Sequence, residues 1–180
     1  MMENVKNPIE EKPDKIILYD RLILEKISEA HSLFMIWGEA LRKDPHIIFL
    51  LTSLDKKISA SWKAMEAFGV GSACRICSEE DGTTCCGAGI ENRYTPRLLL
   101  INLLLGNAFP EKRFRPHGCF FLSERGCSLK ARLVLCVNYL CSKIQGMGSP
   151  EELARLQTIT GLEMDTGFLL DEAVKKFITL

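Results

Sequence analysis

The sequence predicts a mainly α-helical protein that encloses an irregular, cysteine-rich metal-binding segment, with one short β-hairpin permitted by the pattern. Apolar residues recur at spacings of three and four along the N-terminal third, as they do on one face of a helix. All eight cysteines lie between Cys74 and Cys141. With 180 residues, of which 47% are apolar and 26% charged, the chain can bury a core without a metal.

Residues 1–68 carry two apolar stripes and predict two long helices. The first stripe runs from Ile23 to Leu41 and should end before Asp44, which can cap a second helix that has Pro45 at its first position. The second stripe runs from Leu51 to Phe68 and meets a glycine, a common helix stop. Because short connections give antiparallel neighbours, we expect a helical pair packed on its own domain; a dimer seam is the alternative.

Residues 69–145 form the predicted cysteine-cluster segment. Its first part, Cys74 to Asn92, is rich in Gly, Ser, Thr and acids and predicts loop. Thr95 should open a helix that ends at Gly106 and is buried, because it is apolar nearly all round. Residues 119–122 look extended and turn toward Cys127, and residues 128–140 carry a helical stripe.

Residues 146–180 predict C-terminal helices. Ser149 and Glu152 form a capping box, in which each side chain bonds the other residue's backbone N–H. A last short helix is expected over residues 168–177. We expect all three segments to share one compact domain.

The spacing of the cysteines predicts their chemistry. Two residues separate Cys74 from Cys77, so that two thiolates of one turn can converge on a single ion. Acidic residues such as Glu3 and Glu10, and no apolar stretch, precede Ile16, so we expect no secretory signal and a cytoplasmic, reducing location. There, clustered cysteines bind metal more often than they form disulfides. The candidate metal ligands are Cys74, Cys77, Cys85, Cys86, Cys119, Cys127, Cys136 and Cys141.

Two pairs restrict how these thiols can combine. Cys85 and Cys86 are adjacent, so on an extended backbone their side chains point to opposite sides and would serve different ions or different corners of a cluster. Cys136 and Cys141 lie about 140° apart on a continuous helix and could share an ion only if the helix ended between them. Two four-ligand sites and one site with four spare cysteines both remain open.

The order Cys-x2-Cys, Cys-Cys, Cys-Phe-Phe-Leu-x4-Cys-Ser-Leu and two further cysteines resembles the YkgJ-type cysteine-cluster family, which is described as a zinc- or iron-chelating domain. The resemblance covers residues 74–141 and implies that all eight cysteines are ligands. Two features depart from the family pattern. Seven residues, 78–84, precede the Cys-Cys pair where the family has about three, and Leu129 to Leu133 lacks the family's proline.

The sequence slightly favours an iron–sulfur cluster over zinc. An apolar shell excludes solvent and tunes the potential of such a cluster, although the same residues could simply form the core around a zinc ion. The shell would consist of Phe120, Phe121, Leu122, Val134, Leu135, Val137 and Tyr139. Residues 74–141 also hold nine Lys or Arg against six acids, and these cations would offset the negative charge of a thiolate site.

Other functions are less consistent with the sequence. Lys plus Arg and Asp plus Glu both number 23, which argues against a nucleic-acid partner held by counterion release. No apolar run approaches the ~20 residues of a membrane helix. His117, two residues before Cys119, is expected to be a loop residue and not a ligand. We therefore expect a non-catalytic metal-binding module; the alternative is a redox, electron-transfer or enzyme component, and a protein partner stays unspecified.

Overall fold

The computed structural model describes residues 13–80 and 85–179 of the chain. Residues 1–12, on which the expected absence of a secretory signal rests, and residues 81–84 and 180 lie outside the described part. In chain order the elements are α1 (Pro13–Leu41), α2 (Pro45–Ala67), α3 (Val70–Glu80), η1 (Ile90–Arg93), α4 (Pro96–Leu104), β1 (Leu122–Ser123), β2 (Gly126–Cys127), α5 (Val134–Asn138), α6 (Ser142–Gln145) and α7 (Pro150–Thr179). The predicted mainly α fold with one short antiparallel hairpin is confirmed.

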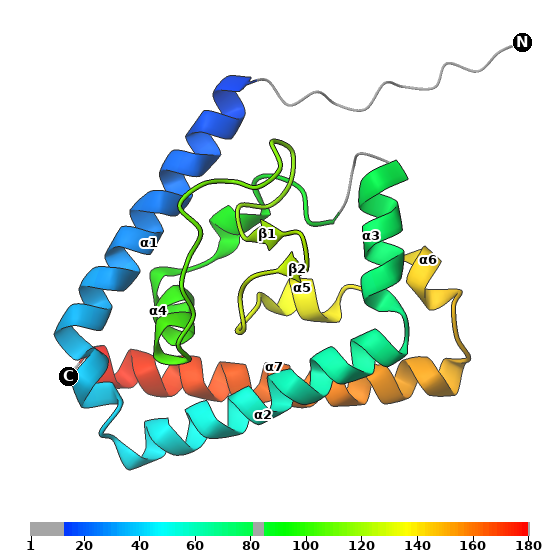
Figure 1. Cartoon of the computed structure of the whole chain (residues 1–180). Coiled ribbons are helices and arrows are strands. Elements are labelled where there is room, and N and C mark those ends of the chain that lie inside the picture. The colour runs from blue at the N-terminus through cyan, green and yellow to red at the C-terminus, as the bar shows by residue number, and fades with distance from the viewer. Residues whose placement is uncertain (1–12, 81–84, 180) are drawn as a thin grey trace, which may run out of the picture.

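The long helices frame the cysteine segment. Figure 1 shows α2 and α7 running side by side in opposite directions, with α1 leaving one end of α2 and α3 the other. The hairpin, α4 and α5 lie between α1 and α3. None of the described helices combines the length and the apolar character that crossing a bilayer requires.

Three predicted helix starts are confirmed by their caps. The Asp44 carboxylate accepts a hydrogen bond from the Ile47 backbone N–H at 2.9 Å. The Thr95 hydroxyl likewise accepts from Leu98 N–H at 3.1 Å. In the capping box the Ser149 N–H donates to the Glu152 carboxylate at 2.8 Å and Glu152 N–H donates to the Ser149 hydroxyl at 3.2 Å. Capping of this kind satisfies backbone donors that the helix itself leaves unpaired.

The first two helices do not form the expected antiparallel pair. The partner of α2 is α7, and α1 instead packs on α4. Helix α7 offers α2 a long apolar surface because it is one continuous helix. Its Leu170 and Val174 are fully buried beside Leu54 of α2.

Helix α4 is buried as predicted and connects two parts of the core. Leu100, Ile101 and Leu104 belong to the first core cluster, which lies between α2 and α7. Leu99 and Leu103 face a second cluster, which is defined by the buried residues Ile23, Ile27, Ala30, Tyr94, Leu99, Leu103, Cys119, Phe120, Phe121 and Leu129. This second cluster attaches the cysteine segment to α1.

Three local predictions were wrong. The stretch from Cys74 begins on helix α3 and is not loop up to Asn92, because Val70 and Ala73 have an apolar cluster to pack against. Residues 128–133 are irregular, and only Val134–Asn138 is helical there. The expected short helix over residues 168–177 is the end of the 30-residue helix α7, which stays helical across Gly161 and Gly167 because it packs along α2.

Candidate metal centre

The eight cysteines are free thiols that fall into two groups of four. We call Cys74, Cys77, Cys85 and Cys141 the outer group. We call Cys86, Cys119, Cys127 and Cys136 the inner group. The grouping follows from which elements pack together, and the electrostatic interactions of Cys85 and Cys74 with Cys86 show that the two groups are neighbours.

The outer group forms where α3 meets α6. Cys74 and Cys77 are three residues apart on α3, so they lie on the same side of that helix. Helix α3 packs against α6, and Cys141 is the residue directly before α6 begins. Cys74 and Cys85 are exposed. Partial shielding of its sulfur from water, followed by the charges of Cys85, Cys141 and Cys77, raises the pKa of Cys74 even though the residue as a whole is exposed.

The inner group is held by the backbone of two connected loops. The Cys119 N–H donates to the Cys86 carbonyl at 2.7 Å, and the Ala88 N–H donates to the His117 carbonyl at 2.9 Å. Cys127 lies in β2 opposite Leu122 of β1, so the hairpin brings it back toward Cys119. Cys136 lies in α5, whose first residues follow the irregular stretch after the hairpin.

The most exposed cysteines, Cys74 and Cys85, belong to the outer group and the one buried cysteine, Cys119, to the inner group; the other five are half-buried. Burial, together with neighbouring cysteines of both groups, raises the pKa of Cys86 to about 12 and that of Cys136 to about 11. Burial also raises the pKa of Cys119 and of Cys127. Without a metal these four thiols are therefore protonated at neutral pH.

Backbone donors reach two inner sulfurs. The Phe121 N–H bonds the Cys119 sulfur and the Leu129 N–H bonds the Cys127 sulfur, and each bond lowers the pKa of its thiol against the effect of burial. Each donor stands two residues after its cysteine. Because an N–H donor favours the thiolate over the thiol, both bonds act in the direction that a metal ligand requires.

The adjacent pair is divided between the groups. Cys85 is exposed, whereas Cys86 packs against the second core cluster. Cys136 and Cys141 are also separated, because α5 ends at Asn138 and a turn precedes α6. Across the described residues, no three Cys, His, Asp or Glu side chains meet at the geometry of an ion site. The thiols are thus grouped, but their sulfurs do not converge on one point.

The apolar shell expected around the cysteines is present in part. Phe120 and Phe121 are buried beside Cys119, and Val137 is buried in a third cluster against which Cys141 packs. Val134, Leu135 and Tyr139 are instead 59%, 49% and 54% exposed. The observation that favoured an iron–sulfur cluster over zinc therefore holds for only part of each group.

Sequence reasoning included Arg132 only as one of the nine cations of residues 74–141, and it did not identify Trp62 or Glu91 as neighbours of the thiols. The charge of Arg132 lowers the pKa of Cys136 and Cys127, and that of Glu91 raises the pKa of Cys119. Glu91 is fully buried and forms an ion pair with Arg113, which also binds Asp20 of α1 at 2.6 Å. The excess of cations over acids in residues 74–141 was the available signal, but it named no residue.

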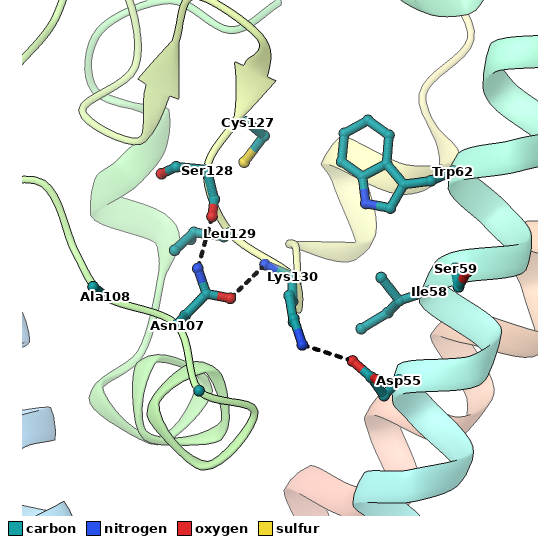
Figure 2. Close-up of a pocket in the computed structure, with 11 residues that line it drawn as sticks. Asp55, Ile58, Ser59, Trp62, Asn107, Ala108, Cys127, Ser128, Leu129 and Lys130 are labelled. Carbon is teal, nitrogen blue, oxygen red and sulfur yellow. Dashed lines mark hydrogen bonds and ion pairs between the residues drawn. The ribbon is translucent and has the colours of Figure 1, made fainter.

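A cavity of about 480 Å³ reaches the inner group from the surface. Figure 2 shows Cys127 and Trp62 on opposite walls of it. Its charged groups bind each other, since the Lys130 ammonium lies 2.9 Å from the Asp55 carboxylate. The Asn107 side chain likewise bonds the Ser128 carbonyl and the Lys130 N–H. These groups are therefore engaged within the protein, and the cavity provides access to Cys127.

No family model, curated protein or solved structure matches this chain. The resemblance to the YkgJ-type family thus rests on the cysteine pattern alone.

Proposed function

We propose that this protein is a metal-binding module in which the outer and inner groups each hold one metal centre through four cysteine thiolates. One observation carries the proposal: the packing of α3 on α6 gathers the outer group, whereas the backbone bond from Cys119 to Cys86 and the hairpin gather the inner group. Four thiolates match the ligand number of a structural zinc site and of a common iron–sulfur cluster.

The donor set fits such a centre. Thiolate sulfur is a soft ligand that selects zinc and iron–sulfur clusters over magnesium or calcium. The two N–H donors at Cys119 and Cys127 stabilise the thiolate form that binds. Since a complete site rarely exists before its metal arrives, we expect the side chains of each group to turn inward on binding. The described sulfurs need this movement, because they do not yet converge.

A non-catalytic role follows from the ligand count. When protein supplies all four ligands, the metal keeps no open position for a substrate, as in structural sites. The centres would instead hold α3, α6 and the hairpin together. A redox or electron-transfer role is the second candidate, and the cavity that reaches Cys127 favours it, because a small electron donor could approach there. An iron–sulfur cluster would be required for that role, since zinc is redox-inactive.

Metal analysis of protein purified without air tests the proposal. We expect about two equivalents of zinc, or iron together with acid-labile sulfide and visible absorption that bleaches on reduction. The His117→Ala variant is the matched control and should keep its full metal content. Metal-free protein, with its thiols either free or paired as disulfides, would contradict the proposal. Zinc alone would exclude the redox role.

A further inference from the structure

Arg132 is a buried cation beside the inner group. Its side chain is 5% exposed and lies in the stretch between Cys127 and Cys136. The guanidinium stacks on the ring of Trp62, with its central carbon 4.1 Å from the ring centroid. Among the described residues its ion-pair partner is the Glu163 carboxylate on α7, 3.5 Å away.

Among the described residues, the Arg132 guanidinium has fewer hydrogen-bond acceptors than it has N–H donors. One guanidinium nitrogen contacts the Met65 sulfur, a weak acceptor, at 3.6 Å, and the buried Nε has no acceptor among the described residues. Two other arginines of the chain show the difference. Arg97 binds both oxygens of Asp171 at 2.7 Å, and the buried Arg113 binds Asp20, Glu91 and a backbone carbonyl.

Burying a charge is costly unless close partners of opposite charge compensate for it. One carboxylate at 3.5 Å is a weak compensation for a guanidinium that has lost its water. Further negative charge close to the Arg132 guanidinium would therefore stabilise it. Arg132 stacks on Trp62, which lines the same cavity as Cys127, so charge gained at the inner group would lie near the guanidinium.

Metal binding would supply that charge. When four thiols bind a divalent ion they release four protons, and the resulting site carries two formal negative charges. We propose, on the basis of the proposed function, that Arg132 is the counter-cation of the inner metal centre. Trp62 holds the guanidinium in place, and Glu163 competes with the metal site for its charge. Arg132 is a positioning and charge-balancing residue and not a ligand, since a guanidinium has no lone pair to offer.

The proposal gives Arg132 and Glu163 opposite effects. Removing the cation should weaken metal binding, because the anionic product loses its compensation. Removing the carboxylate should strengthen it, because Glu163 competes with the metal site for the same guanidinium and repels the thiolates. If the pair merely fastened the cysteine segment to α7, both changes would weaken binding.

The test measures zinc affinity by competition with a chromophoric chelator. A full-length Cys74→Ser, Cys77→Ser background removes the outer centre and isolates the inner one. We expect Arg132→Gln to bind zinc about 10- to 100-fold more weakly, the range typical of residues that support metal ligands. Arg132→Lys should lose less affinity, since it keeps the charge, and Glu163→Gln should bind several-fold more tightly. Arg97→Gln, which breaks an ion pair with α7 elsewhere, should leave the affinity unchanged.

The outcomes separate the two proposals. If the background protein binds no zinc, the proposed function fails at the inner group. If it binds zinc and Arg132→Gln binds equally well, or if Glu163→Gln weakens binding as Arg132→Gln does, the role of Arg132 is overturned. Should Arg132→Gln fail to fold, Arg132→Lys and Glu163→Gln still decide the question through the sign of their effects.

Discussion

The outer and inner cysteine groups have the same number of thiols but different surroundings. Cys74 and Cys85 of the outer group are exposed, and its helices α3 and α6 contact the rest of the protein at the end of α2. The inner group is built into the second core cluster, in which Cys119 is buried beside Phe120 and Phe121. A metal in the outer group would thus order a peripheral helix, whereas one in the inner group would be part of the core.

The largest predicted effect is on global stability. In metal-loaded protein, Cys119→Ser should lower the free energy of unfolding by roughly 2–4 kcal/mol, because it removes a metal ligand and leaves a buried hydroxyl. Cys74→Ser should lower it by less than about 1 kcal/mol, because α3 can open locally while the core stays folded. Urea unfolding of both variants measures the difference.

The same two variants after chelation serve as the control for the metal. There, Cys119→Ser should cost only about 1–3 kcal/mol, the usual penalty for a buried unpaired polar group, and Cys74→Ser should cost nothing measurable. Equal losses for the two variants in loaded protein would contradict the contrast between a core centre and a peripheral one.

The second prediction concerns thiol reactivity in metal-free protein. The thiolate is the form that reacts with iodoacetamide, and burial raises the pKa of Cys136 from 9.0 to about 11. The raised pKa means that Cys136 stays protonated at pH 8 and gains thiolate steadily up to pH 10. Its alkylation rate should therefore rise about 100-fold over this interval, against about tenfold for an unperturbed thiol. Mass spectrometry of timed samples resolves each cysteine.

A tenfold rise at Cys136 would show that the inner group opens to water when the metal leaves. In that case the burial described for metal-free protein would not hold in solution, and the contrast between the groups would depend on the metal. The Arg132→Lys variant should give the same pH profile, since it keeps the cation that acts on this thiol.

Much of the fold could be predicted because it depends on local signals. The Asp44, Thr95 and Ser149 caps need only a side chain and the next backbone N–H groups, and all three were correct. Partner choice was not predictable in this way. Apolar stripes show that a helix is buried but do not show against what, so α7 displaced α1 as the partner of α2.

In the candidate site, too, the features set by local spacing were predictable and those set by contacts between distant segments were not. Its eight thiols and the separation of Cys85 from Cys86 follow from spacing, but the end of α5 between Cys136 and Cys141 does not, because the apolar stripe continues through Leu140. The role of Arg132 does not, because Trp62 and Glu163 come from helices far away in sequence. The exposure of Leu135 and Tyr139 was equally hidden, since the sequence shows that residues are apolar near a cysteine but not which way they face.

The smallest predicted effect, a change of about twofold in metal content, tests the boundary between the groups. Cys85→Ser should lose the outer metal and keep the inner one, and Cys86→Ser should do the reverse, because the two side chains lie on different sides of the chain. The double variant should lose both metals. Elemental analysis gives the content. Hydrogen exchange gives the location, with protection lost in α3 for the first variant and in the hairpin for the second.

For Cys86 there is a specific alternative to the role of metal ligand, namely packing in the core. A free cysteine packs well as a small apolar side chain, and Cys86 already lies against the second core cluster. If packing were its whole role, Cys86→Ser would keep its full metal content and lose stability alone. The Cys86→Ala variant separates the two roles: it preserves a small apolar side chain but no ligand, so the metal should still be lost. Full metal in Cys86→Ala would remove Cys86 from the inner group and leave that centre with three cysteines.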